Sequence, residues 1–379
     1  MSLHLRNVAV LVALGALLAA CGKKAEEPGP AAAAVETDAE KVLNVYNWSD
    51  YIDPDLLKQF ETETGIKVVY DEMDNNEILD TKLKAGRSGY DVVAPSASFL
   101  ANQIKAGIYQ KLDKSKLSNY KNLDPEIQKK LAAFDPGNEY AVNYMWGTSG
   151  ISYNEEKIKA IDPDAPVNSF AMFYDPNVIR KFQKCGISVL DAPGEVVGTV
   201  LIYLGKDANS EKPEDLAAAE KVLMSIRPYI RKIESSAYIE NLAGGEWCLV
   251  LGWSGDVLQA ASRAEENKQP FHIRYHVPQE GAVQFFDNFA IPADAAHVKN
   301  AHLFIDFMNR PEVAAKNSTY ISYANGNSAS KALIDPAVRD NPEVYPPPEL
   351  AAKLVPDLPE SPEFTKQLTR VWQRFKTGK

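Results

Sequence analysis

The feature that most constrains the fold is a regular alternation of short apolar and amphipathic segments between Val42 and Gly107. Three apolar segments predict strands, and the apolar residues of the segment after each one repeat at helical spacing. A glycine follows each predicted helix, as is common at helix ends. The predicted strands are 42–46, 66–70 and 90–94, and the predicted helices are 54–64, 77–85 and 98–106. This repeat predicts an α/β protein whose parallel sheet has helices on both faces.

A second series of strands and helices follows Tyr153 and runs to the end of the chain. Two α/β units joined by more than one crossing fit this length. Apolar segments near 146–153 and 286–291 can form the crossings and act as a hinge, whereas the proline-rich residues 341–362 predict ordered surface coil. We therefore predict two lobes, made of residues 41–147 plus 272–320 and of residues 148–271 plus 321–379.

Length and charge narrow the classes of protein. The chain has 379 residues, of which 45% are hydrophobic, and a formal net charge of -10. A chain of this length predicts two or three globular units. Its acidic character argues against nucleic acid as a partner, because such proteins need a basic surface. The excess of negative charge is compatible with a cationic partner, but it is also common among soluble proteins.

The first forty residues predict export rather than fold. Residues 1–20 predict a signal peptide, with Arg6 near its start and an apolar segment too short to span a bilayer. The segment ends in Leu18-Ala19-Ala20-Cys21, which resembles the lipobox of bacterial lipoproteins, in which the cysteine becomes lipidated. An ordinary secretory signal is the alternative. Residues 21–40 lack core periodicity and predict a flexible tether, so we expect an anchored protein rather than a membrane-spanning one.

The chain has three cysteines. If Cys21 carries the lipid, Cys185 and Cys248 remain, and export to an oxidising compartment favours a disulfide between them. Two buried free thiols are the alternative. A disulfide that closes a loop of this size stabilises a fold by about 2–4 kcal/mol.

Sequence signatures of catalysis and of metal binding are missing. None of the five histidines belongs to a His-Glu-x-x-His motif, and there is no Cys-x-x-Cys. Gly252-Trp253-Ser254-Gly255 lacks the spacing of a nucleophile elbow. Neither a P-loop nor a dinucleotide fingerprint occurs. The sequence therefore supports no enzyme, no metal site and no cofactor, and an extracytoplasmic hydrolase is the least favoured alternative.

Aromatic and acidic residues gather instead on loops that follow predicted strands. The segment Tyr46-Asn47-Trp48-Ser49-Asp50-Tyr51 lies at the carboxyl end of the first strand, where open α/β folds hold their ligands. Aromatic faces attract positive charge and a carboxylate pairs with it, so this loop suits an organic cation. Each such loop alone also fits helix capping or core packing.

Seven segments together resemble the polyamine-binding proteins of bacterial ABC transporters, and the resemblance runs from about Val42 to the C-terminus. Tyr46–Ile52 and Gly252–Asp256 are the most distinctive. The other five are 95–99, 147–154, 190–195, 285–287 and 290–294. The resemblance implies a two-lobed periplasmic-binding-protein fold, with a mixed sheet flanked by helices in each lobe and a ligand cleft between the lobes.

The resemblance also implies a set of ligand-binding residues. They are Trp48, Ser49, Asp50, Tyr51, Ser96, Glu195, Trp253, Asp256, Phe285, Asp287 and Tyr323. A diamine carries two ammonium groups joined by methylenes. We expect Asp256 and Asp287 to hold one ammonium together with the two serines, and Asp50 and Glu195 to face the other. The tryptophans, the phenylalanine and the last tyrosine would cover the methylenes.

Ser49-Asp50 and Phe285 are similar to the putrescine branch of that family, since spermidine binders tend to carry Thr-Glu after the first tryptophan. We therefore predict a periplasmic, lipid-anchored monomer that closes on putrescine and delivers it to an ABC transporter permease. The alternative ligands are spermidine and another cationic solute. The alternative role is that of a module that presents its ligand to a sensor.

Overall fold

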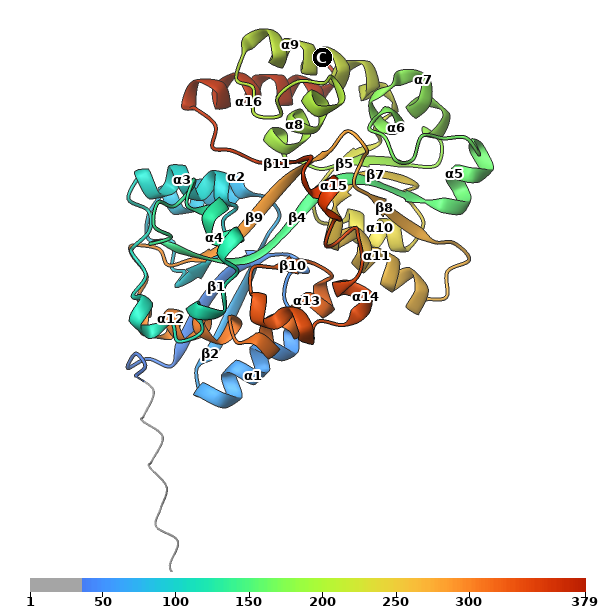
Figure 1. Ribbon diagram of the computed structural model, residues 1–379. Helices are drawn as coiled ribbons and strands as arrows, with labels where there is room; N and C mark the ends of the chain where they lie inside the picture. The colour runs from blue at the N-terminus through green and yellow to red at the C-terminus, as the bar shows by residue number, and fades with distance from the viewer. Residues whose placement is uncertain (1–35) are drawn as a thin grey trace, which may run out of the picture. The chain divides into compact units, whose positions relative to one another are not determined.

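A mixed sheet of eleven strands organises residues 36–379, the part of the chain that this computed structural model describes (Figure 1). The strands are β1 (Val42–Trp48), β2 (Lys67–Met73), β3 (Val92–Val93), β4 (Ala141–Asn154), β5 (Ile187–Val189), β6 (Lys232–Ile233), β7 (Leu249–Trp253), β8 (Ile273–His276), β9 (Ala282–Ala290), β10 (Ala324–Asn325) and β11 (Leu354–Pro356). Eight of them follow the order β2-β1-β3-β9-β4-β7-β5-β6. The predicted signal peptide, Cys21 and most of the predicted tether lie outside the described residues.

Sixteen α-helices alternate with the strands along residues 36–379. They are α1 (Pro54–Thr64), α2 (Asn76–Lys84), α3 (Ala97–Lys105), α4 (Pro125–Leu131), α5 (Glu155–Ile161), α6 (Ala171–Tyr174), α7 (Pro176–Ile179), α8 (Pro193–Tyr203), α9 (Pro213–Ile226), α10 (Tyr238–Ala243), α11 (Ser254–Glu266), α12 (Val298–Met308), α13 (Pro311–Ile321), α14 (Pro336–Arg339), α15 (Pro348–Ala351) and α16 (Pro362–Thr377). The predicted α/β class is thus confirmed.

Strands β2, β1 and β3 run parallel and form what we call the first side of the sheet. Helix α1 begins at Asp53, whose carboxylate accepts a hydrogen bond from the Asp55 backbone N–H. It ends at Gly65, whose φ of +69° costs glycine little. The bounds of α1 agree with the predicted helix 54–64. Strand β3 is shorter than predicted, because only two of its residues pair with a neighbour.

Strands β7, β5 and β6 are also parallel and form the second side. Helices α8, α9 and α16 pack together beside it, at the top of Figure 1. The buried residues of α16 recur at helical spacing, which gives this helix one apolar face: Phe364, Leu368, Val371, Trp372 and Phe375. Within residues 36–379, no helix combines the length and the apolar content that crossing a membrane requires.

Two long antiparallel strands, β4 and β9, join the sides (Figure 1). Residues 141–149 of β4 pair with β9, and residues 149–153 pair with β7. Gly147 of β4 lies against the rings of Phe285 and Tyr323. A Cβ at this position would come within 2.7 Å of Phe285 Cζ, so a residue larger than glycine would clash there. The sequence placed these two crossings near 146–153 and 286–291, so it found the strands but not their full lengths.

A third segment also crosses between the sides, and here the sequence prediction was wrong. Residues 341–362, which we expected to be surface coil, contain α15 and β11. Strand β11 pairs in parallel with residues 282–284 of β9, and the chain then enters α16. A three-residue strand between prolines carries no apolar alternation, so periodicity gave no indication of it.

Two short strands lie beside β4 on either side of Gly147. Strand β8 pairs with residues 151–154, next to the second side. Strand β10 pairs with residues 145 and 146, toward the first side. The predicted lobe boundaries, which place 272–320 with the first lobe and 321–379 with the second, stay a prediction.

Candidate functional site

Ten of the eleven predicted ligand residues line one narrow cavity of about 30 Å³ between the two sides of the sheet. The first side contributes the carboxyl end of β1 and the loop after β3, and the second contributes the starts of α8 and α11. Parallel strands bring these carboxyl ends together. The complete lining is Trp48, Ser49, Tyr51, Met73, Asp74, Ser96, Glu195, Ser235, Ser236, Ile239, Trp253, Asp256, Phe285, Asp287 and Tyr323.

Asp287 on β9 is held by two hydroxyl groups. Tyr51 Oη donates to Asp287 Oδ2 at 2.7 Å, and Ser96 Oγ donates to Oδ1 at 2.6 Å. Asn76 Nδ2 in turn donates to Ser96 Oγ at 3.0 Å, which fixes the serine. Burial raises the pKa of Asp287 to about 6, even though both hydroxyls stabilise its ionised form.

Asp256 in the first turn of α11 has a matching environment. Tyr323 Oη donates to Asp256 Oδ1 at 2.7 Å, and Tyr238 Oη donates to Oδ2 at 2.8 Å. Burial raises the pKa of Asp256 to about 7 against the opposite effect of these hydrogen bonds. The ring centroids of Tyr51 and Tyr323 are 4.8 Å apart, so the two aspartates flank one pair of tyrosines.

Glu195 in the first turn of α8 marks another part of the cavity. It accepts hydrogen bonds from Ser149 Oγ at 2.6 Å and from Trp253 Nε1 at 2.9 Å. Burial is the main cause that raises its pKa to about 8, and the nearby carboxylate of Asp357 raises it further.

Aromatic rings form the walls between these carboxylates. The ring centroids of Trp48 and Trp253 are 5.7 Å apart, and Phe285 lies 6.3 Å from Trp253 and 6.2 Å from Tyr323. Trp48 Nε1 donates to the Ala94 carbonyl at 2.9 Å, so the ring is fixed by the neighbouring strand segment. These edge-to-face contacts create an apolar channel with ring faces available to a ligand.

Asp256, Asp287 and Glu195 share one electrostatic property. Each accepts two hydrogen bonds, but none forms an ion pair with a described lysine, arginine or histidine. A buried carboxylate without a positive partner is costly to ionise. A cation with N–H donors would remove that cost, and the aromatic faces would stabilise it further. The arrangement therefore suits a small organic cation with charge at more than one point.

Asp50 is the one predicted ligand residue that the structure does not bring to the cavity. Its φ of +52° accompanies a turn away from the lining, and its carboxylate pairs instead with Arg263 of α11. The distance from Asp50 Oδ1 to Arg263 Nη2 is 2.5 Å. Arg263 also pairs with Glu240. Asp50 therefore links the two sides at the surface, and its predicted contact with an ammonium group has no support in this geometry.

The family described as bacterial extracellular solute-binding protein matches residues 55–346. The chain belongs to this family. The solute-binding protein is 49% identical, over 93% of its length and 96% of the relative, to the putrescine-binding periplasmic protein SpuD of Pseudomonas aeruginosa. It is also 49% identical, over 90% of its length and 92% of the relative, to the putrescine-binding periplasmic protein PotF of Escherichia coli.

A solved structure has the same architecture as this solute-binding protein. It is a putative spermidine/putrescine ABC transporter protein from Listeria monocytogenes, with a TM-score of 0.80 and 32% identity over 90% of this chain and all of that one. The predicted two-lobed periplasmic-binding-protein fold is confirmed by this likeness. Since the family consists of solute-binding proteins, the protein is a binding protein and not an enzyme.

Sequence reasoning missed five residues of the lining. Met73 and Asp74 follow β2, and Ser49 Oγ donates to Asp74 Oδ1 at 3.5 Å. The rule that loops after parallel strands hold ligands would have found them. Ser235 and Ser236 follow β6, a two-residue strand that the sequence did not indicate, and Ile239 lies in the next helix.

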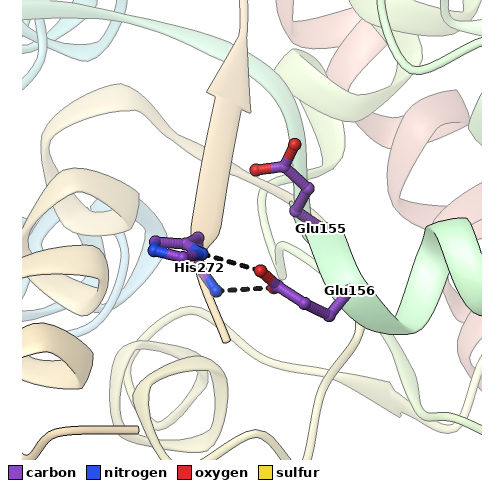
Figure 2. Close-up of side chains that lie close together, drawn as sticks. All are labelled: Glu155, Glu156 and His272. Atoms are coloured by element: carbon purple, nitrogen blue, oxygen red, sulfur yellow. Dashed lines mark hydrogen bonds and ion pairs between the residues drawn. The ribbon is translucent and has the colours of Figure 1, made fainter. Parts of the chain in front are cut away.

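Among residues 36–379 of the solute-binding protein, one group of side chains has the composition of a metal site, and Figure 2 shows it. His272 Nδ1 lies 2.7 Å from Glu156 Oε1, and both residues are exposed. Hydrogen bonds from Lys159 and Arg274 lower the pKa of the third member, Glu155, to about 2. Because two cations already neutralise Glu155, the group is an ordinary surface ion-pair network.

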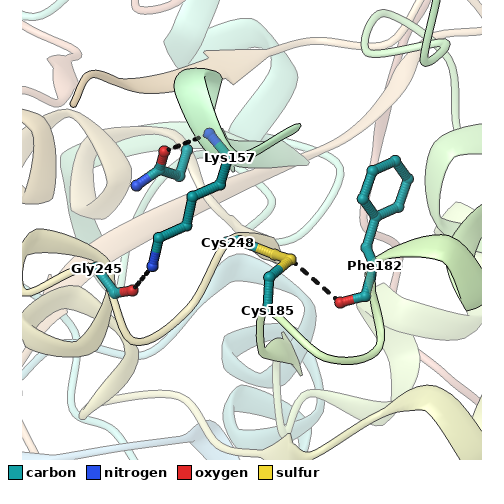
Figure 3. The surroundings of a disulfide bond; sticks show 6 residues. Lys157, Phe182, Cys185, Gly245 and Cys248 are labelled. Carbon is teal, nitrogen blue, oxygen red and sulfur yellow. Dashed lines mark hydrogen bonds between the residues drawn. A yellow bond between two sulfur atoms is a disulfide. The ribbon is translucent and has the colours of Figure 1, made fainter. Parts of the chain in front are cut away.

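The predicted disulfide between Cys185 and Cys248 is present (Figure 3). It joins the loop before β5 to the residue before β7, so it links neighbouring parallel strands of the second side. Lys157 donates to the Gly245 carbonyl close by. The alternative of two free thiols is thereby excluded, and the bond lies in the body of the second side rather than in the cavity.

Proposed function

We propose that this protein binds putrescine and delivers it to the permease of an ABC transporter. The observation that carries the proposal is a set of three carboxylates without a cation in one aromatic channel: Asp256, Asp287 and Glu195. Putrescine supplies two ammonium groups joined by methylenes, which match those acids and rings. The names of two relatives at 49% identity support the same ligand.

One ammonium group would lie between Asp256 and Asp287. The tyrosines that donate to these aspartates have ring centroids 4.8 Å apart, which supports a shared binding point. The second ammonium would face Glu195. The two hydrogen bonds that Glu195 accepts come from neutral groups, so its carboxylate has no positive partner among the described residues. Charge-assisted hydrogen bonds at both ends would select a ligand whose two ammonium groups are separated by the distance between these acids. The methylenes would be covered by Trp48, Trp253 and Phe285.

Binding would favour a closed form of the two lobes. Asp287 and Ser96 lie on one side of the cavity and Asp256 and Glu195 on the other, so neither side alone holds the diamine. Contacts made by both sides shift the population toward closure. The hinge would consist of β4, β9 and β11. We propose lobes that divide at Gly147, with the β8 segment joined to the second lobe and the β10 segment to the first, because each pairs there with β4.

We also propose that the protein works in the periplasm as a lipid-anchored monomer. The relatives are named periplasmic proteins. The lipobox-like segment that ends in Cys21 would supply the anchor, and residues 21–40 would hold the folded part away from the membrane. Globomycin, which blocks lipoprotein signal cleavage, should cause the precursor to accumulate. Normal processing in its presence would contradict the anchor.

Calorimetric titration with putrescine tests the site. Asp256→Asn and Asp287→Asn should each weaken binding at least tenfold, because each removes a charge partner of one ammonium. Asp164→Asn, at an exposed aspartate remote from the cavity, is the matched control and should bind as the unaltered protein does. Unchanged affinity in both cavity variants would contradict the proposed site.

Delivery is tested separately from binding. Deleting the gene should abolish uptake of labelled putrescine, and the Asp256→Asn variant should fail to restore it. Normal uptake in the deletion strain would instead favour a module that presents the diamine to a membrane sensor.

A further inference from the structure

Tyr238 in α10 is fully buried and does not belong to the lining of the cavity. Its hydroxyl group nevertheless contacts two residues that do. Tyr238 Oη donates to Asp256 Oδ2 at 2.8 Å, and it accepts a hydrogen bond from the Trp253 backbone N–H at 3.1 Å. One hydroxyl group therefore joins an acid and the backbone of an aromatic residue that we place around the diamine.

The surrounding elements hold the Tyr238 ring in one place. Helices α10 and α11 pack against each other (Figure 1). The ring centroids of Tyr238 and Trp253 are 6.4 Å apart. A Cβ at Gly252 of β7 would lie 3.0 Å from Tyr238 Cε2, closer than an ordinary van der Waals contact, so glycine at this position leaves room for the ring. The hydroxyl group is thus fixed beside the first turn of α11.

The hydrogen bond that Tyr238 accepts sets the direction of the one that it donates. Trp253 precedes α11, and no side chain caps the helix at this residue. Its backbone N–H occupies the acceptor position of Tyr238 Oη, so the hydroxyl proton is directed at Asp256. Two hydrogen bonds in such a chain polarise and strengthen each other. Without the hydroxyl, the buried Asp256 carboxylate would lose one of its two donors.

The two tyrosines that donate to Asp256 come from different parts of the fold. Tyr323 lines the cavity and precedes β10, which pairs with β4 toward the first side. Tyr238 lies in α10, on the same side of the cavity as Asp256, because α10 and α11 follow β6 and β7. When the proposed lobes separate, Tyr238 keeps its hydrogen bond to Asp256. It can therefore hold this carboxylate in the open form as well as in the closed one.

The same hydrogen bond affects the charge of Asp256. Burial raises the pKa of Asp256 to about 7, whereas the hydrogen bonds from the two tyrosines act in the opposite direction. The Asp50 carboxylate raises this pKa, and the Arg263 guanidinium lowers it. The titratable and charged groups that face Asp256 from the elements around it are Tyr238, Tyr323, Tyr51, Asp50 and Arg263.

We infer that Tyr238 is a positioning residue for diamine binding, which orients the Asp256 carboxylate toward the ligand and favours its ionised form without touching the ligand. This inference rests on the proposed function. A carboxylate that has lost this donor is freer to turn and easier to protonate. Once protonated, it offers an ammonium group no negative partner. Loss of the hydroxyl should therefore matter most at a pH where Asp256 is partly protonated.

Calorimetric titration with putrescine at pH 6.5 and pH 8.5 tests this role. Tyr238→Phe removes only the hydroxyl. It should weaken binding about threefold at pH 8.5, where orientation alone is lost, and at least tenfold at pH 6.5, where more of Asp256 is also protonated. Tyr174→Phe is the matched control, because it removes a buried hydroxyl that pairs with Thr199 outside the cavity lining. It should bind as the unaltered protein does at both pH values.

A double-mutant cycle shows whether Tyr238 acts through Asp256. In the Asp256→Asn background, Tyr238→Phe should change the affinity for putrescine less than about twofold at either pH, because the carboxylate that it positions is gone. Melting temperatures of the unliganded variants show whether each is folded. If Tyr238→Phe does not fold, Tyr238→Met replaces it, since methionine fills the space with a flexible apolar side chain.

The outcomes separate the inference from the proposed function. A loss of affinity that is no larger at pH 6.5 than at pH 8.5 would overturn the inference. So would a loss that persists in full in the Asp256→Asn background. Both results leave the diamine site standing. If the unaltered protein bound no putrescine, the proposed function would fail, and the inference that rests on it would fail too.

Discussion

The carboxylates of the cavity and those of the surface differ in how the protein treats their charge. Glu155 on the surface has two cationic partners, and their hydrogen bonds lower its pKa to about 2. Asp256 and Glu195 in the cavity have hydroxyl and indole donors but no cation, and burial raises their pKa values to about 7 and 8. The charge of Glu155 is therefore neutralised by cations of the chain itself, whereas the charges of Asp256 and Glu195 are not.

This difference identifies the site better than acidity alone does. The chain has 51 acidic residues, and several of the described ones form ion pairs at the surface, as Glu155, Glu63 and Asp340 do. Within residues 36–379, Asp256, Asp287 and Glu195 line one cavity, each with two hydrogen-bond donors arranged around it. The fold holds these acids in an unfavourable state that a dication relieves, so selectivity against neutral solutes follows from electrostatics.

The largest expected effect compares Asp256→Asn with Glu155→Gln. At pH 8 the first change should raise the free energy of unfolding of the unliganded protein by about 1–3 kcal/mol, because it removes a buried charge. The second should lower it by up to about 1 kcal/mol, because it breaks a partly exposed ion-pair network. Urea unfolding measures both. If both variants were less stable than the unaltered protein, the conclusion that the cavity carboxylate is held in an unfavourable state would be wrong.

A smaller effect concerns pH. The folded-state pKa values of Asp256, Asp287 and Glu195 are about 7, 6 and 8, above those of an unfolded chain. As pH rises from about 4 to 8, the unliganded protein must lose protons that the unfolded chain has already lost, so these groups reduce its stability. A bound diamine favours the ionised forms. Its stabilising effect should therefore grow with pH.

Thermal denaturation at pH 5 and pH 8, with and without saturating putrescine, measures this dependence. The increase in melting temperature caused by putrescine should be larger at pH 8. The raised pKa of His297 also reduces stability with rising pH, but it acts equally with and without ligand and cancels in the difference. An increase that is larger at pH 5 would contradict the electrostatic account.

The smallest expected effect concerns the ion pair between the two sides. Arg263→Gln should weaken putrescine two- to fivefold, because it removes a partly exposed partner of Asp50 worth less than about 1 kcal/mol. Arg274→Gln, which breaks a surface pair with Glu155, is the matched control. Calorimetry at two salt concentrations should show the Arg263 effect shrink at high salt. If Arg263→Gln and Arg274→Gln changed the affinity for putrescine equally, the ion pair between Asp50 and Arg263 would have no role in closing the two lobes.

Much of this site could be predicted because its residues follow strands. Trp48 and Trp253 are the last residues of β1 and β7, and Ser96 follows β3; the apolar character of all three strands is visible in the sequence, and the helix 54–64 has its predicted bounds. The family resemblance supplied Glu195 and Tyr323, which no local pattern singles out. Sequence reasoning therefore succeeded where local periodicity and ligand position coincide.

The rest depends on pairing between distant segments. Nothing near Asp50 in sequence indicates that Arg263, more than two hundred residues later, takes its carboxylate. Asp357 lies in a proline-rich stretch, and its place near Glu195 is set by β11 pairing with β9. Such positions follow from tertiary contacts and not from local propensity.

The continuity of β4 and β9 restricts how the protein can move. Sliding one strand past the other would break the hydrogen bonds between residues 141–149 and 283–290, whereas twisting distributes small changes of φ and ψ over many residues. Opening and closing must then be a torsion that keeps the strands in register. Every cycle of loading and unloading would return the same side chains to the same partners, and thermal agitation alone could reset the empty protein.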